Sequence, residues 1–112
     1  MFKLEQPKSV TWPVTVNIPQ DGGKTKRNVF TAEFELLDQD EFNAIYKEDG
    51  GNDQDLIRRT LIGWSDVADP EGNPIDFDSD ARERLIRIPY VRTGLVNAYL
   101  ECSFGKAAAR KN

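Results

Sequence analysis

The sequence contains no histidine and only one cysteine, Cys102, in its 112 residues. The absence of histidine removes the commonest general base of enzymes and the commonest protein ligand of zinc. A single cysteine cannot form an intrachain disulfide, which fits a protein of a reducing cytoplasm. Cys102 lies on the apolar side of a predicted helix, so we expect a buried thiol rather than a nucleophile. We therefore expect a protein that is not an enzyme.

Long apolar runs are also missing from the sequence. No stretch approaches the roughly 20 apolar residues that span a bilayer, and the first residues lack the apolar segment of a signal peptide. We therefore expect a cytoplasmic protein with no membrane partner. The hydrophobic content of 38% is still sufficient for one modest core, so we predict a single domain over residues 1–112.

The charges and glycines exclude further classes of partner. The net charge is −4, with the acidic residues concentrated between residues 38 and 82, a nearly neutral segment before them and a basic segment after them. Nucleic acid is bound by continuous basic surfaces, so we expect no nucleic-acid partner. The stretch Gly22-Gly23-Lys24-Thr25 lacks the upstream glycine of a phosphate-binding loop and indicates a hairpin turn. We expect no cofactor.

An acidic stretch between residues 66 and 78 contains the only grouping that suggests a metal. It does not follow the order of ligands in a calcium-binding EF-hand loop, because Val67 would occupy the first ligand position and Asp78 the place of the bidentate glutamate. We interpret this stretch as a solvated loop stabilised by Asx-turns, with a loosely held divalent cation as the alternative. We predict no metal site.

Two runs of alternating apolar residues predict an antiparallel β-hairpin over residues 9–37. Residues 9–19 alternate between apolar and polar positions, and Pro13 within them favours an edge strand or a bulge. Residues 28–37 alternate in the same way, and the turn between the runs is rich in glycine. Because an isolated hairpin is marginal in water, its apolar face needs a cover. We predict an α+β fold, with this N-terminal antiparallel hairpin packed against a C-terminal group of three to four helices.

Capping residues place the first helices of the part from residue 38 to residue 104. Asp38, followed by Glu41, predicts a capping box for a helix that stops at residues 48–51. Asn52 is expected to cap a second helix, and its apolar face continues to Trp64. We interpret Trp64 as a core anchor, with a partner contact as the alternative.

The last two helices also carry clear start and stop residues. Asp78 or Ser79 is predicted to open a short helix, and Pro89 favours the first position of the final one. Gly105 is suited to the left-handed conformation that ends this helix near Phe104. We expect the basic tail over residues 105–112 to fray.

The final helix has more apolar surface than one core contact needs. At about 100° per residue, Val91, Leu95, Ala98 and Cys102 form one apolar stripe. A second stripe consists of Val96, Leu100 and Phe104, and Tyr99 lies between the two. Either the helix is buried on two sides, or the second stripe meets another protein. On the second interpretation the candidate partner-binding residues are Val96, Tyr99, Leu100 and Phe104.

The order of these signals resembles that of the tail assembly chaperones of bacteriophages with long, non-contractile tails. The resemblance covers about 100 residues. It is carried by Phe2-Lys3-Leu4-Glu5, Phe30-Thr31-Ala32-Glu33-Phe34, Leu37-Asp38-Gln39-Asp40-Glu41-Phe42, Leu61-Ile62-Gly63-Trp64-Ser65-Asp66-Val67, Asp69-Pro70-Glu71-Gly72-Asn73-Pro74-Ile75 and the helix from Pro89 to Leu100.

The resemblance implies a chaperone that binds the long, apolar tape measure protein, keeps it soluble and promotes polymerisation of the tail-tube protein around it. It implies a location in the cytoplasm of the infected or lysogenic host and absence from the mature virion. Several copies of a covering protein would act together, so a homo-oligomer is also expected. The alternative is a structural component of the phage tail or of the head–tail joint.

Overall fold

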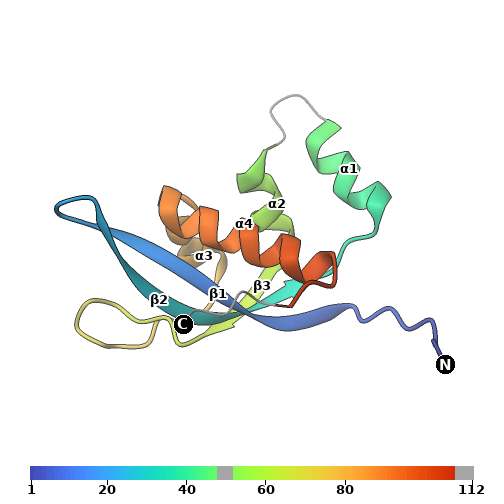
Figure 1. Ribbon diagram of the computed structural model, residues 1–112, viewed down its shortest axis with the longest axis horizontal. Coiled ribbons are helices and arrows are strands. Elements are labelled where there is room, and N and C mark those ends of the chain that lie inside the picture. The colour runs from blue at the N-terminus through green and yellow to red at the C-terminus, as the bar shows by residue number, and fades with distance from the viewer. Residues whose placement is uncertain (48–51, 108–112) are drawn as a thin grey trace.

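The computed structural model describes residues 1–47 and 52–107, and within them a three-stranded sheet carries its helices on one side (Figure 1). The predicted stop of the first helix at residues 48–51 and the end of the tail lie outside these residues. The elements in chain order are β1 (Ser9–Gln20), β2 (Lys24–Glu35), α1 (Gln39–Lys47), α2 (Asp53–Thr60), β3 (Leu61–Ser65), α3 (Ser79–Ile86) and α4 (Pro89–Ser103). The α+β class and the N-terminal hairpin are confirmed.

The hairpin follows the alternation of the sequence. β1 and β2 pair in antiparallel register from Ser9 opposite Glu35 to Gln20 opposite Lys24. Gly22 and Gly23 in the turn have φ of 80° and 77°, a left-handed conformation that glycine adopts without a steric penalty. β1 is an outer strand of the sheet, which explains how Pro13 is accommodated, since an edge strand has one side free of ladder hydrogen bonds.

The third strand corrects the predicted second helix. α2 ends at Thr60, and Leu61 to Ser65 pair with β2 as β3, with Leu61 opposite Phe34 and Trp64 opposite Ala32. The register shifts between Glu33 and Phe34, so Ile62 is an additional residue in β3. The apolar spacing of α2 extends to Leu61 and Trp64, which is why a longer helix was predicted. The two residues instead pair with β2, which lies far from them in the sequence.

The helix starts agree with the predicted caps. Asp38 and Glu41 form a reciprocal capping box, in which each backbone N–H donates to the other residue's carboxylate at 3.1 and 2.9 Å. Asn52 accepts from the N–H of Asp55, and Asp78 accepts from that of Ala81. Pro89 opens α4, and Gly105, with φ of 69°, follows its end. These short-range signals were therefore correctly interpreted.

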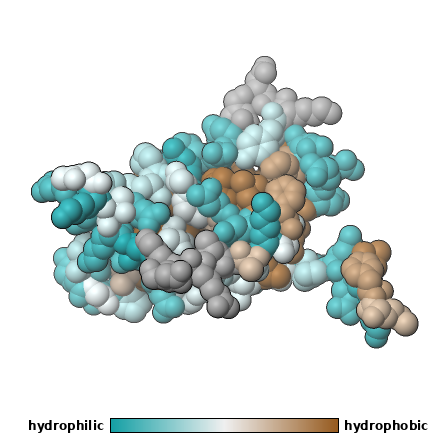
Figure 2. Space-filling view, in the orientation of Figure 1, coloured by the Kyte–Doolittle hydropathy of each residue, from teal (hydrophilic) through white to brown (hydrophobic). Residues whose placement is uncertain are grey.

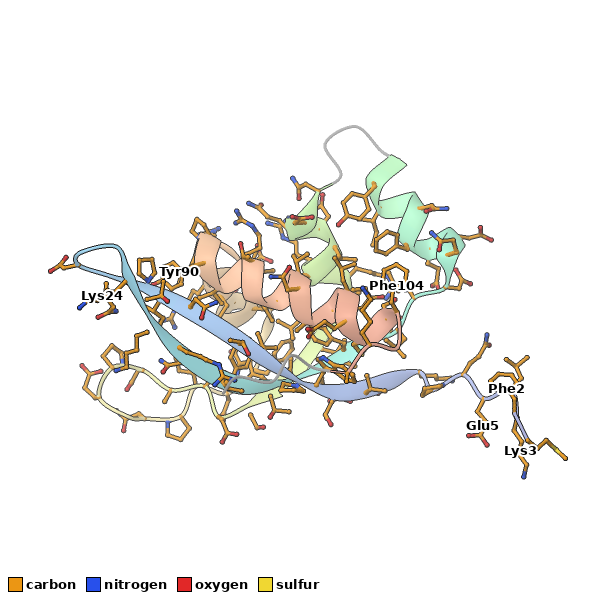
Figure 3. All side chains as sticks on the ribbon, viewed as in Figure 1. Phe2, Lys3, Glu5, Lys24, Tyr90 and Phe104 are labelled. Carbon is orange, nitrogen blue, oxygen red and sulfur yellow. The ribbon has the colours of Figure 1, made fainter. Side chains whose placement is uncertain are left out.

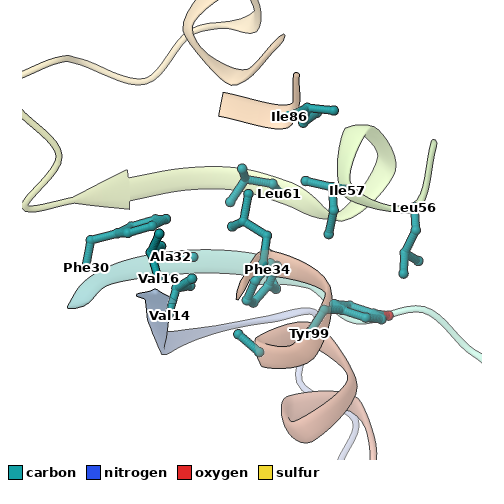
Figure 4. Close-up of a cluster of buried hydrophobic side chains, with 12 residues drawn as sticks. Val14, Val16, Phe30, Ala32, Phe34, Leu56, Ile57, Leu61, Ile86 and Tyr99 are labelled. Carbon is teal, nitrogen blue, oxygen red and sulfur yellow. The ribbon is translucent and has the colours of Figure 1, made fainter. Parts of the chain in front are cut away.

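The hydrophobic core lies between the apolar face of the sheet and the helices α2, α3 and α4. Figure 4 shows Phe34 of β2 beside Tyr99 of α4, with residues of α2, β3 and α3 around them. The two rings meet edge to face with their centroids 5.5 Å apart. The fully buried large side chains are Val14, Phe34, Leu56, Ile57, Thr60, Leu61, Ile86, Leu95 and Tyr99.

α4 rests directly on β1 through a glycine. A Cβ atom placed on Gly94 would lie 2.5 Å from the carbonyl oxygen of Thr15 and 3.5 Å from a methyl group of Val14. No side chain larger than hydrogen fits there unless the helix and the strand separate. This contact sets both the distance of α4 from β1 and its rotation about its own axis.

We expect Gly94→Ala to destabilise the protein, although alanine normally favours a helix by about 1 kcal/mol over glycine. Overpacking against backbone costs about 1–3 kcal/mol, so the free energy of unfolding in urea should fall. Asn97→Ala, on the exposed side of the same helix, is the control and should have a neutral or slightly stabilising effect. Equal stability of Gly94→Ala and the wild type would show that the contact is not restrictive.

Candidate partner-binding surface

The packing of α4 separates the four predicted partner-binding residues. Tyr99 is completely buried, and its hydroxyl accepts a hydrogen bond of 3.2 Å from the backbone N–H of Leu37. The proposal of Tyr99 as a contact for another protein is therefore wrong. The buried arc of α4 is wider than expected, because the helix lies against both β1 and α2.

The other three candidates follow the border of the buried arc. Val96 and Leu100 are half-buried and contact the core with part of their surface. Phe104, directly after α4, is 67% exposed. In the other stripe, Leu95, Ala98 and Cys102 are buried as predicted, while Val91 is only half-buried. One stripe therefore belongs to the core, and the other offers apolar surface that increases toward the end of the helix.

α1 contributes a second amphipathic helix on the same side of the molecule. Phe42 and Ile45 are half-buried against the core, and Tyr46, whose ring lies 5.2 Å from that of Phe42, is 40% exposed. Figure 2 shows hydrophobic side chains gathered above α4, where this helix faces α2 and α1. We call the region formed by Phe42, Ile45, Tyr46, Val96, Leu100 and Phe104 the helical surface.

Arg59 of α2 connects α1 to the sheet through two ion pairs. Its guanidinium group donates to Glu35 of β2 at 2.6 Å and to Glu41 of α1 at 3.1 Å. The hydrogen bond to Glu35 raises the pKa of Arg59 above its ordinary value. Since the capping box also uses Glu41, one carboxylate connects the start of α1 with α2.

We expect Arg59→Gln to loosen α1 more than it destabilises the whole protein. The two ion pairs are partly exposed, and each contributes about 1 kcal/mol or less. Amide exchange in α1 should accelerate, while the midpoint of urea unfolding should change little. Arg58→Gln is the matched control, because Arg58 pairs with Asp55 and Glu83 and makes no ion pair to α1. Acceleration in both variants would contradict the role of Arg59.

Tyr46 joins the end of α1 to the start of α2. Its hydroxyl donates to Asp53 at 3.0 Å. Partial burial, followed by this hydrogen bond and the negative charge of Asp53, raises the pKa of Tyr46 from 10.0 to about 12. The raised pKa of the folded state means that this contribution to stability is complete below pH 10 and is lost as the pH rises through about 12.

We expect Asp53→Ala to lower the pKa of Tyr46 but to leave it above 10, because burial, the largest cause of the shift, remains. The value is obtained from the difference in tyrosinate absorbance between each protein and its Tyr46→Phe derivative. Asp55→Ala, on the same helix, should leave the Tyr46 titration unchanged. An unchanged pKa in Asp53→Ala would show that the carboxylate does not contact the phenol.

Hydrogen bonds to the side chains of Asp69 and Trp64 order the loop after β3. The carboxylate of Asp69 accepts hydrogen bonds from the backbone N–H groups of Asn73 and Glu71, at 2.9 and 3.0 Å. The hydrogen bond from Asn73 lowers the pKa of Asp69 below its ordinary value. The indole N–H of Trp64 donates to the carbonyl oxygen of Ile75 at 2.7 Å. Asx-turns thus stabilise the loop as predicted, and half-buried Trp64 anchors it to β3.

This loop also forms one wall of a groove at the turn end of the hairpin. The groove has a volume of about 510 Å³, and both strands of the hairpin, α3 and the start of α4 form its other walls. We call it the hairpin groove. Its lining is mainly apolar: Val16, Ile18, Val29, Phe30, Val67, Ala68, Pro70, Ile75, Leu85, Ile88 and Val91, with the polar residues Asn28, Asp66, Asp69 and Arg84.

The described residues offer few groups for chemistry. No cluster of three or more histidine, cysteine, aspartate or glutamate side chains in residues 1–47 and 52–107 could hold a metal ion. Cys102 is buried, and this burial raises the pKa of its thiol. No helix in this part of the chain is long and apolar enough to cross a membrane.

Comparisons with protein families, curated proteins and solved structures found no match.

Sequence reasoning missed the contribution of α1 to the helical surface and the whole hairpin groove. The spacing of Phe42 and Ile45 did signal an amphipathic helix, but not that its apolar side would be only partly covered. The groove residues come from four separate elements, the loop after β3 and the junction between α3 and α4. No local pattern brings them together, so only the tertiary structure reveals this site.

Proposed function

We propose that this protein is a phage tail assembly chaperone, and that its helical surface binds amphipathic segments of the tape measure protein. One observation carries the proposal: α1 and α4, which both contact α2, leave apolar side chains partly uncovered, and Phe104 directly after α4 is 67% exposed. Such a surface can cover the apolar side of another helix, as grooves that bind amphipathic helices do. The resemblance of the sequence to this family supports the same function.

The charges around this surface suit a client-binding role. α1 and α2 both carry acidic residues in their first turns, at positions 40, 41, 53 and 55. Apolar contacts bordered by charged residues combine binding with solubility of the complex. On this proposal the protein acts in the cytoplasm of the bacterial host, helps tail-tube subunits assemble around the tape measure protein and is absent from the mature virion.

On this proposal a tape measure protein is encoded near this chain, and co-expression with that protein is the direct test. We expect the wild type to keep that client soluble and Phe104→Glu to lose this ability, because a charge would be desolvated at the interface. Phe104→Glu should remain folded, since exposed substitutions usually change stability by about 0.5 kcal/mol or less. Asn97→Glu, at an exposed position of α4, is the matched control and should retain activity.

Leu95→Glu provides the opposite control, because Leu95 is fully buried and the variant should unfold. A client that aggregates with and without the wild type would refute the proposal. Full activity of Phe104→Glu would refute the assignment of the surface. The protein's presence in purified, mature tails would instead favour a structural component.

A further inference from the structure

The helical surface adjoins a groove at the end of α4, which we call the terminal groove. This groove has a volume of about 480 Å³ and is lined by residues 5–8, by residues 36–38 with Glu41, and by Ser103. Ser103 directly precedes Phe104, which is 67% exposed. Figure 1 shows the start of α1 and the end of α4 on the same side of the molecule. A partner that covers Phe104 therefore also meets the lining of this groove.

The charged side chains of the terminal groove are mostly acidic. Its lining includes the carboxylates of Glu5, Asp38 and Glu41 and the ammonium group of Lys8. Figure 3 shows Glu5 on the same side of the molecule as Phe104 and farther from its body. Within residues 1–47 and 52–107, neither Glu5 nor Asp38 forms an ion pair. The helical surface is therefore bordered by negative charge near Phe104.

The start of α1 extends this negative charge. Arg59 of α2 pairs with both Glu35 and Glu41, so its single positive charge cannot balance the two carboxylates. Asp40, in the first turn of α1, is exposed and forms no ion pair in the part of the chain that the structure describes. Exposed charges act over about 10 Å at 0.1 M salt. Negative charge thus accompanies the apolar residues of α1.

The end of α4 also carries negative charge. The carbonyl end of a helix has a partial negative charge, which basic residues in the last turn can offset. The last turn of α4 has no basic residue and contains Glu101. Lys106, the next cation in the sequence, lies beyond the helix. Both helices of the helical surface are therefore accompanied by negative charge.

We propose that the helical surface selects amphipathic helices that carry lysine or arginine beside their apolar side, and that it disfavours acidic ones. The inference rests on the proposed client-binding function and adds to it the charge of the client segment. A helix whose apolar side covers Leu100 and Phe104 brings its flanking side chains to the terminal groove and to α1. Basic side chains there meet opposite charges, whereas acidic side chains meet charges of their own sign.

Three synthetic peptides of about 18 residues, or five helical turns, test this charge preference with the full chain. They share one stripe of leucines, and the positions that flank the stripe are lysine, glutamine or glutamate. Fluorescence anisotropy of the labelled peptides gives each dissociation constant. At about 0.1 M salt, we expect the lysine peptide to bind about tenfold or more tightly than the glutamate peptide, with the glutamine peptide between them. The difference should fall to about threefold or less at 1 M salt, where the screening length is about 3 Å.

Two double variants separate the local charge from the net charge of the protein. Asp38→Asn with Asp40→Asn removes two charges beside the helical surface, and asparagine retains the N-cap of α1. Asp78→Asn with Asp80→Asn is the matched control, because these residues are the N-cap and a first-turn acid of α3. We expect the first variant to bind the lysine peptide about threefold or more weakly, with unchanged affinity for the glutamine peptide. The control variant should bind both peptides like the wild type.

The possible failures of the inference and of the proposed function are distinguishable. Equal affinity of the wild type for the three peptides would overturn the inference but leave the binding surface in place. Equal weakening in both double variants would also overturn it, because net charge would then explain the preference. If no peptide bound, or if binding survived in Phe104→Glu, the binding surface of the proposed function would be refuted together with this inference.

Discussion

The contact between Gly94 and the backbone of Thr15 determines how the rest of the molecule is arranged. It seats α4 on an edge strand of the sheet, at a distance that any side chain at position 94 would prevent. With the rotation of α4 fixed there, Leu95 and Tyr99 turn into the core and Phe104 turns out of it. The same contact covers part of an outer strand, which would otherwise offer backbone groups for pairing with another chain. Both the core and the apolar exterior of α4 thus follow from one close approach.

The molecule has two apolar sites that lie apart and differ in construction. The helical surface is made of side chains on α1 and α4, and charges hold α1 beside the body through Arg59. The hairpin groove is made of strands, a loop and the junction of two helices, and a hydrogen-bonded turn around Asp69 shapes one wall.

Local signals in the sequence predicted most of the fold, and long-range pairing accounts for what they missed. The alternation of apolar and polar residues predicted the hairpin, and the Asp38–Glu41 capping box predicted the start of α1. Pro89 and Gly105 predicted the start and the end of α4. The residues of β3 read as a continued helix because their apolar spacing matched α2, while their strand character depends on β2. Tyr99 was misplaced for a related reason: a single helix does not reveal how many neighbours it has. The hairpin groove was not predicted, because its lining residues are far apart in the sequence and come together only in the folded chain.

The position of α4 at the end of the folded chain has a consequence for biosynthesis. The hairpin is translated first, but a hairpin alone is marginally stable, and the helix that contacts β1 most extensively begins only at Pro89. A nascent chain therefore carries Val14, which packs beside Gly94 of α4, without this cover until residues 89–103 have been made. The contact between α4 and β1 forms only after residues 89–103 have left the ribosome, so the completion of the core comes late in synthesis. Until that moment, this protein itself resembles the aggregation-prone chains that a chaperone protects.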